Sequence, residues 1–312
     1  VMTRDTHTTV EVCICTFRRP SLSRAIHSVL AQRLPEDVRL SVLVIDNDVT
    51  PSAARLVAEL TEGAEVPLRY AHRPSGNISI ARNGALELCK ARYLAFLDDD
   101  EVAAPGWLAA LVYSAQASGA DVVLGPVTAV YPAETPHWIR RLDLHSTRPV
   151  HVGGEIRTGY TCNVLIDRES EAINDLRFDL SLGRSGGEDT VFFAEIHARG
   201  GHIVHAEGAI VTEDVSASRS KFSWLARRRF RRGQSHGRLL AGDSGGWIRL
   251  QQMCGASAKV TFCLGVAALR FASVPRRNAA ILRGCLHLGT MTGLLGATPI
   301  ELYGSTTTGA TK

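Results

Sequence analysis

The chain has 312 residues, 45% of them hydrophobic and 21% charged, which is enough for one large core or two small ones. Its 35 basic and 31 acidic residues leave a formal net charge of +4, too small for a dedicated nucleic-acid-binding protein. A mean hydropathy of +0.02 excludes a polytopic membrane protein. The first ten residues are polar, so the sequence predicts no signal peptide and a cytoplasmic protein.

Apolar runs alternate with amphipathic stretches along the first 130 residues. The pattern predicts strands over 10–16, 40–45, 68–71, 93–97 and 121–130, and helices over 21–32, 52–60, 79–90 and 105–118. This order predicts a mostly parallel sheet with helices on both faces, in which ligands bind beyond the carboxyl ends of the strands. Polar residues follow four of these strands, at 16–19, 46–48, 73–77 and 98–101. We expect them to form one site.

The second part of the chain is less regular. Residues 132–158 indicate a loop or an irregular excursion. After it the pattern predicts a strand over 161–166, a helix over 188–199, short strands over 202–205 and 209–212, and a very basic helix from 222 onward.

Four consecutive acidic residues, Asp98–Glu101, follow the apolar run 93–97. Carboxylates this close repel one another unless a cation or a hydrogen-bonded ribose offsets their charge. A divalent ion that bridges a diphosphate needs such an oxygen-rich edge. The alternative is a solvated acidic turn before a helix N-terminus, where carboxylates are also favourable.

Five motifs, in this order, resemble glycosyltransferase family 2, whose members are inverting enzymes with the GT-A fold. They are VCICTFRRP (12–20), VIDND (44–48), RPSGNISIARN (73–83), LDDDE (97–101) and GGEDTVFF (186–193). The resemblance covers residues 10–235 and is greatest to bacterial enzymes of the succinoglycan glucosyltransferase type, which act in exopolysaccharide assembly. It implies an α/β, GT-A (Rossmann-like) catalytic domain over 1–235.

The resemblance also implies roles for residues at matching positions. Those that would bind the nucleotide sugar are Thr16, Phe17, Arg18, Asp46, Asn47, Asp48, Arg73, Gly76, Arg82, Asp98 at the ribose, and Asp99 beside it. Alternatively, Phe17 is a packing residue, Asp46 caps the next turn, and Arg82 only neutralises the acidic cluster. Asn47 stands where the family has an Asp that reads uracil, which is compatible with UDP and leaves other nucleotides open.

Inverting transfer needs one general base that deprotonates the acceptor hydroxyl. The resemblance assigns this role to Asp189 first and to Glu188 second, although carboxylates also cap helix N-termini. Asp100 would bind a divalent metal ion, Mn²⁺ or Mg²⁺. Glu213 stands near the place where many GT-A enzymes have a His that contacts metal or phosphate, and it could substitute for it.

Residues 219–238 contain eight basic residues and no acidic one. Arg228 and Arg229 are the candidates for binding the diphosphate of the donor, as a flexible loop does in this family. The other cations would face anionic lipid, or form a solvated basic surface. We expect no nucleic-acid binding, because no aromatic residues interleave with the cations at a spacing suited to stacking.

Residues 244–300 contain no Asp or Glu. The ten-residue apolar stretch between Lys259 and Arg270 is too short for a spanning helix, and the charge-free stretch 284–300 is rich in Gly and Thr. We therefore expect 236–300 to be a basic helical extension that lies on a membrane surface, with an oligomer contact or a cap on the catalytic domain as alternatives. Residues 301–312 are expected to be a disordered tail.

The expected function is inverting transfer of a hexose from a nucleotide sugar, UDP-linked, to a saccharide hydroxyl. The expected acceptor is a polyprenyl-diphosphate-linked glycan of exopolysaccharide assembly, at the inner face of the cell membrane. One alternative is the decoration of a soluble secondary metabolite. A nucleotidyltransferase would have a Gly-rich phosphate loop after the first strand, which TFRRP is not. A non-catalytic nucleotide-sugar-binding module is the remaining class.

Overall fold

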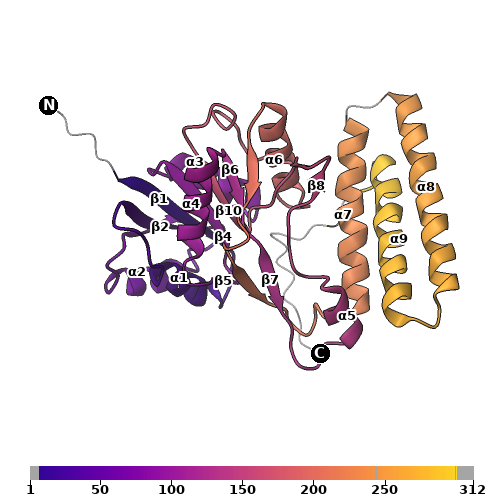
Figure 1. The fold of residues 1–312 in the computed structure, drawn as a ribbon, viewed down its shortest axis with the longest axis horizontal. Coiled ribbons are helices and arrows are strands. Elements are labelled where there is room, and N and C mark those ends of the chain that lie inside the picture. Colours follow the sequence, from indigo (N-terminus) through magenta and orange to yellow (C-terminus); the bar gives the residue numbers. More distant parts are fainter. Residues whose placement is uncertain (1–6, 243–244, 299, 301–312) are drawn as a thin grey trace.

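A seven-stranded sheet forms the centre of the computed structural model, which describes residues 7–242, 245–298 and 300 (Figure 1). The strands in spatial order are β11 (Ile203–His205), β6 (Val122–Leu124), β10 (Asn163–Asp167), β4 (Tyr93–Asp98), β1 (Thr8–Thr16), β2 (Val38–Asp46) and β3 (Leu68–His72). Neighbours are parallel except at β10, which runs antiparallel to both β4 and β6. The predicted mostly parallel α/β sheet is confirmed.

Helices cover both faces of this sheet, because its strands are apolar on both sides. One face carries α1 (Leu22–Leu30), α2 (Ala54–Thr61) and α4 (Trp107–Ser118), and the other carries α3 (Ile78–Leu88) and α6 (Glu188–Ala198). The two-residue period of a strand produces this division. In β1, Val12 and Ile14 pack with the first set of helices and Cys13 packs with the second.

The strand predicted over 121–130 is wrong, because two strands in two sheets occupy this segment. β6 belongs to the central sheet, whereas β7 (Val127–Val130) pairs with β12 (Val211–Asp214) in a second sheet that β5 (Glu101–Ala103) completes. Gly125 and Pro126 separate the two strands. Pro126 has no N–H for a ladder hydrogen bond, and a Cβ atom at Gly125 would lie 2.4 Å from the Nδ2 atom of Asn163.

The excursion over 132–158 contains short regular elements. They are α5 (His137–Leu142) and a hairpin of β8 (His151–Val152) and β9 (Glu155–Ile156).

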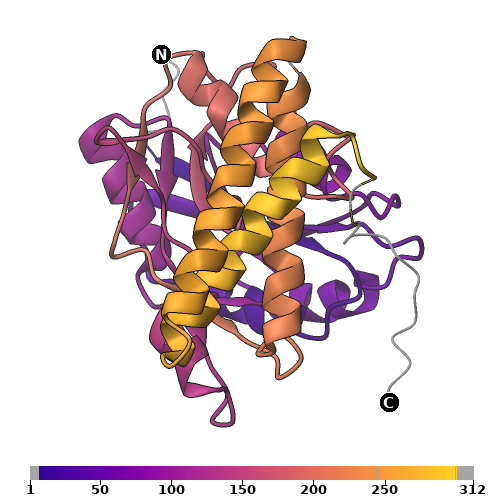
Figure 2. The ribbon, with the colours of Figure 1, turned by 90° about the vertical axis from the view of Figure 1, so that its right-hand side faces the viewer.

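Three long helices stand beside the sheet domain. They are α7 (Phe222–Gly242), α8 (Gly246–Leu269) and α9 (Val274–Leu294). α9 lies between α7 and α8, and α8 is the outermost (Figures 1 and 2). α7 runs through residue 235, where the sequence predicts the end of the catalytic domain. The predicted tail, 301–312, lies outside the described residues.

Helices α7 and α9 touch backbone to backbone through glycines. Gly233 and Gly237 on α7 face Gly289 and Gly293 on α9. A Cβ atom at Gly289 would lie 1.9 Å from the carbonyl oxygen of Phe230, and one at Gly233 would lie 1.9 Å from that of Leu286. Small residues at this spacing permit such close approach. The position of α7 is therefore tied to that of α9.

Helix α8 joins stretches that look short in the sequence into one continuous helix. It is the one helix of the described chain that is long and apolar enough to cross a membrane, by length and composition alone. The ten-residue apolar stretch after Lys259, too short by itself to span a membrane, is thus the last part of a longer helix. Only 17% of its most apolar stretch is buried in the protein.

Candidate active site

The carboxyl ends of β1, β2 and β4 meet at one edge of the sheet. In the parallel register Thr16 is opposite Asp46, and Cys15 is opposite Asp98. The polar residues that follow these strands are thus brought together, as the sequence predicts. This edge is where open parallel sheets bind ligands.

Asp99 closes the loop after β1. Its Oδ2 atom accepts a hydrogen bond from the Thr16 hydroxyl at 2.7 Å and one from the Phe17 backbone N–H at 3.4 Å. Burial raises the pKa of Asp99 to about 6, although these hydrogen bonds oppose the shift. Thr16 and Asp99 therefore hold the loop to the acidic run from the inside, and Phe17 remains half-buried beside it.

Asp98 and Asp100 are half-buried on the same edge. Burial raises the pKa of Asp98 to about 7, and the negative charges of Asp100 and Asp99 add to the shift while Arg82 opposes it. Glu101 is buried and accepts a hydrogen bond from the Asp98 backbone N–H. The acidic run Asp98–Glu101 thus places more negative than positive charge in a largely buried position.

Two arginines neutralise part of this negative charge. Arg19 lies 3.6 Å from Asp99 and 3.7 Å from Asp100, measured from guanidinium nitrogen to carboxylate oxygen. Arg219 lies 3.7 Å from Asp100 and forms a close ion pair with Glu213. Glu213 of β12 therefore lies near the acidic edge, with Arg219 between it and Asp100.

The segment after β2 is held by internal hydrogen bonds. Asp46 is fully buried and accepts hydrogen bonds from the backbone N–H groups of Asp48 and Ala53 and from the Tyr70 hydroxyl. These contacts match the alternative in which Asp46 caps the turn after β2. Asp48 accepts from the Nε atom of Arg18 at 2.7 Å, and this guanidinium lowers the pKa of the carboxyl. Arg18 lies over the ring of Phe17, 5.5 Å from its centroid.

Asn47 connects the β2 end to the turn after β3. Its Oδ1 atom accepts from the Ser75 hydroxyl at 2.6 Å, and its carbonyl oxygen accepts from the backbone N–H of Gly76. Gly76 has φ +57°, a conformation that favours glycine. Arg73 points toward helix α3 instead, where it pairs with Glu87 at 3.1 Å.

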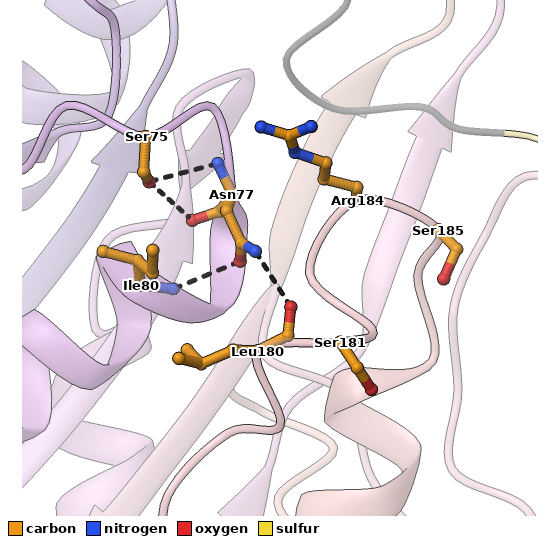
Figure 3. Close-up of a pocket in the computed structure, with 7 residues that line it drawn as sticks. All are labelled: Ser75, Asn77, Ile80, Leu180, Ser181, Arg184 and Ser185. Carbon is orange, nitrogen blue, oxygen red and sulfur yellow. Dashed lines mark hydrogen bonds between the residues drawn. The ribbon is translucent and has the colours of Figure 1, made fainter.

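A cavity of about 430 Å³ lies beside this turn (Figure 3). Its walls are Ser75, Asn77, Ile80, Leu180, Ser181, Arg184 and Ser185. Asn77 caps α3 and donates to the carbonyl oxygen of Leu180 at 2.9 Å, and the guanidinium of Arg184 points across the cavity toward the turn (Figure 3). Hydroxyl, amide and guanidinium groups make this cavity suitable for a polar ligand.

Glu188 and Asp189 have different environments at the start of α6. Glu188 is 3% exposed and forms a close ion pair with the buried Arg82, whose guanidinium also lies over the Phe178 ring. Asp189 is half-buried and accepts from the backbone N–H of Thr190 at 2.7 Å. Arg82 on α3 therefore pairs with the buried carboxylate of α6 while its charge also acts on Asp98, and Asp189 is the more accessible carboxylate of α6.

The thiol of Cys162, just before β10, is subject to the charges of several of these carboxylates. Burial raises the pKa of its thiol well above the usual range, and the negative charges of Glu101, Asp98, Asp189 and Glu213 raise it further. These carboxylates come from β4, β5, α6 and β12, and each of them raises the pKa of the same thiol. The charges of the acidic run and of the α6 carboxylate thus both act on this thiol.

The basic helix α7 faces this site. Burial lowers the pKa of Arg228 to about 9, and repulsion by Arg232 contributes; burial also lowers the pKa of Arg229. The Trp224 ring lies beneath Arg228, with 5.3 Å from guanidinium carbon to ring centroid, and beneath Arg219 at 5.6 Å. Concentrated positive charge beside an acidic edge suits a ligand that carries both a cation and a diphosphate.

Sequence reasoning gave no individual role to four residues of this site. They are Arg19, Cys162, His145 and Arg219, of which His145 is buried and stacks on Trp224 with 5.3 Å between ring centroids. Arg19 and Arg219 carry a signal, since Arg19 stands in a basic pair after the first predicted strand and Arg219 begins the basic stretch that follows Glu213 and Asp214. Cys162 and His145 carry none, because only the packing of distant segments brings them to the site.

The carboxylates fit a divalent metal ion held jointly with a ligand. No three His, Cys, Asp or Glu side chains in the described ranges are grouped so as to hold a metal by themselves. Mg²⁺ commonly takes one or two carboxylates and completes its coordination with substrate phosphates. Asp100, the predicted metal residue, and Asp98, predicted at the ribose, could supply hard oxygen ligands in this place, where negative charge is in excess.

Comparisons with known proteins agree with this geometry. The family model described as "Glycosyl transferase family 2" matches residues 11–172. The succinoglycan biosynthesis protein ExoM of Rhizobium meliloti is 47% identical over 95% of this chain and 96% of its own length. A glucosyl-dolichyl phosphate glucuronosyltransferase of Haloferax volcanii is 26% identical over 72% of this chain and 75% of its own.

Solved structures share the fold. The mannosyltransferase PcManGT of Pyrobaculum calidifontis, in complex with GDP-Man and Mn²⁺, has a TM-score of 0.61 at 19% identity and covers 93% of this chain and 88% of its own. S. aureus TarS 1–349 in complex with UDP has a TM-score of 0.53 at 16% identity, over 93% and 92%. With the matched family and the extended identity, the resemblance stated from the motifs is confirmed: the chain belongs to glycosyltransferase family 2 and is a glycosyltransferase.

Proposed function

We propose that this enzyme transfers a hexose, with inversion, from a UDP-linked donor to a hydroxyl of a lipid-linked saccharide in exopolysaccharide assembly. The observation that supports it most is the acidic edge after β4, which Arg219 joins to Glu213 of β12, with the Arg82–Glu188 ion pair at the start of α6. Such a site can hold a donor at one end and a base for the acceptor at the other. The 47% identity to a succinoglycan biosynthesis protein supports the pathway class.

In the proposed reaction the acidic and the basic side chains have different roles. Asp189 takes the proton from the acceptor hydroxyl as that oxygen attacks the anomeric carbon. The leaving diphosphate carries negative charge away from the sugar, and Arg228 and Arg229 stabilise it from α7. A divalent ion, when bound at Asp100 and Asp98, supplies further charge neutralisation to that diphosphate.

The nucleotide end lies at the β1 and β2 loops. Phe17 and Arg18 offer an aromatic face and a cation to the base. Asp46, Asn47, Asp48 and Gly76 shape the loop backbone through their mutual hydrogen bonds, and Thr16 and Asp99 fix the ribose side. Arg73 and Arg82 support this arrangement through their ion pairs.

Titration of UDP, GDP and dTDP into the purified protein, with and without Mn²⁺, tests the donor end. UDP should bind more tightly with Mn²⁺, and Asp100→Asn should weaken that binding at least about tenfold because a hard ligand is lost. Asp214→Asn is the matched control, since Asp214 is exposed and pairs with Arg24 at 2.8 Å. Preference for GDP or dTDP would overturn the UDP assignment alone. Absence of all nucleotide binding by a folded sample would overturn the donor site.

Transfer from UDP-hexoses to a lipid extract of exopolysaccharide-producing cells tests the acceptor. The proposal expects a product whose new anomeric bond has the configuration opposite to the donor, read by NMR. Transfer only to soluble glycosides would favour the alternative, a secondary-metabolite glycosyltransferase. A lipid-linked acceptor would also hold the enzyme at the inner face of the cell membrane.

A further inference from the structure

The outer face of helix α8 exposes large apolar side chains in the part of the chain that the structure describes. Those on α8 are Trp247, Ile248, Leu250, Phe262, Leu264 and Leu269, with Phe271 directly after it. Trp247 and Phe262 are both 70% exposed, and Leu269 is 87% exposed. The other face of α8 packs on α9, where Ala256, Cys263 and Ala267 are buried. Exposed apolar surface this extensive marks an interaction site.

The charge of the segment that contains α8 and α9 has a single sign. Residues 244–300 contain six Lys and Arg residues and no Asp or Glu. They are Arg249, Lys259, Arg270, Arg276, Arg277 and Arg283. Long basic side chains can keep their charge in water while their stems cover apolar surface. A partner for this face must therefore be apolar beneath and anionic at its surface, which is the chemistry of a bilayer with anionic lipids.

The position of α8 makes its outer face accessible to a flat surface. Helix α8 is the outermost element on the side away from the central sheet, with α9 and α7 behind it (Figures 1 and 2). A flat surface can meet it without displacing the sheet domain.

The length of α8 permits a span, but its packing does not favour one. Helix α9 lies along its inner face and brings Arg276, Arg277, Arg283 and His287 with it. A spanning α8 would have to carry these side chains into the bilayer or separate from α9. Charged groups inside a bilayer are costly.

We infer that α8 docks on an anionic bilayer with its axis in the plane of the interface, through the Trp247–Phe262–Leu269 face. This inference does not rest on the proposed reaction. It makes α8 a peripheral anchor that holds α7 and the site behind it at a fixed distance from the lipid surface.

Flotation of the full chain with vesicles tests the docking. The protein should float with vesicles of phosphatidylcholine containing about 30% phosphatidylglycerol, and much less with phosphatidylcholine alone or at high salt. The double variant Trp247→Ser, Phe262→Ser should reduce binding at least about tenfold. Tyr113→Ser is the matched control, because Tyr113 on α4 is 73% exposed and lies outside this face. It should bind as the wild type does.

Tryptophan quenching by brominated lipids tests the orientation. Trp247 and a Phe262→Trp substitution stand 15 residues apart, about 22 Å along the helix. An in-plane helix places both indoles at the same shallow depth, and a spanning helix places them at different depths. Trp247→Phe gives the background of the other tryptophans.

Three results would overturn the inference. One is no flotation of a folded sample, and another is unequal quenching depths together with resistance to carbonate extraction. The third is a stable dimer in light scattering that the double variant converts to a monomer, because a second copy would then cover α8.

Discussion

Arg219 stands beside Asp100, with 3.7 Å between guanidinium nitrogen and carboxylate oxygen, and its other nitrogen pairs with Glu213. The same side chain lies over the Trp224 ring, which also supports Arg228. A protein cation thus occupies the edge where the proposed metal ion would bind. Entry of a divalent ion at Asp100 must overcome or displace Arg219, so donor binding and the arrangement of the segment before α7 are linked.

Arg219→Gln should therefore strengthen binding of Mn²⁺ alone. Removing one like charge about 4 Å away changes the interaction by about 1 kcal/mol or more, which is about fivefold in affinity. Calorimetric titration with Mn²⁺ in the absence of nucleotide measures it, and Arg219→Lys, which keeps the charge, serves as the control. Equal Mn²⁺ affinity of the Gln variant and the wild type would show that Arg219 does not compete for the site.

Asp189→Asn should lower kcat about 10²- to 10⁴-fold because the general base is lost. UDP binding should remain as in the wild type, since Asp189 does not contact the nucleotide end. Steady-state transfer rates and UDP titration together separate the two effects. Glu195→Gln on the same helix, where Glu195 pairs with Arg199 at 3.0 Å, is the control and should keep full activity. Full activity of Asp189→Asn would transfer the role to another residue.

Glu188→Gln should act on stability first. Its carboxylate is 3% exposed and pairs with Arg82, so the neutral variant leaves a buried guanidinium without its counter-charge. Breaking a buried pair costs about 3 kcal/mol or more in the free energy of unfolding. Chemical denaturation measures it, and Glu59→Gln in the exposed pair with Arg55 should cost about 1 kcal/mol at most. A stable but inactive Glu188→Gln variant would instead favour Glu188 as the base.

The sequence predicts the sheet edge well, because parallel strands end where their apolar runs end. The residues after β1, β2 and β4 are brought together by register alone. The sequence does not predict the contacts between the excursion 132–158 and α7. His145 and Trp224 are 79 positions apart and stack on each other, and no periodicity records that contact. The break at Gly125–Pro126 is visible in the sequence, but its cause lies in Asn163, which donates to the carbonyl oxygens of Pro126 and Ala209.

His145 should make the stability depend on pH. Burial lowers the pKa of His145 to about 4, and the neighbouring Arg228 and Arg219 oppose its protonation while Asp143 favours it. The unfolded chain takes up this proton near pH 6.5, and the folded chain does so only near pH 4. The free energy of unfolding should therefore fall as the pH drops through this window, by at most about 3 kcal/mol from this residue.

His145→Phe isolates that contribution. A Phe side chain keeps the stacking on Trp224 but cannot take up a proton. Denaturation of both proteins from pH 7 to pH 4 should give a shallower decline for the variant. Parallel curves would mean that His145 is protonated equally in the folded and unfolded states.

Gly289→Ala should separate helix α7 from α9. The new Cβ atom would lie 1.9 Å from the carbonyl oxygen of Phe230, a backbone atom that cannot turn aside. Overpacking of this kind costs about 1–3 kcal/mol, and the thermal midpoint should fall accordingly. Because α7 carries Arg228 and Arg229, the variant should also weaken UDP binding more than uridine binding.

Gly265→Ala on α8 is the control, since nothing lies within 4 Å of its Cβ position. That variant should be neutral or stabilised by up to about 1 kcal/mol, because Ala is the better helix former. Loss of UDP affinity at an unchanged midpoint in Gly289→Ala would show that α7 moves without unfolding. An unchanged midpoint and unchanged UDP affinity would show that the two helices are not held together by this contact.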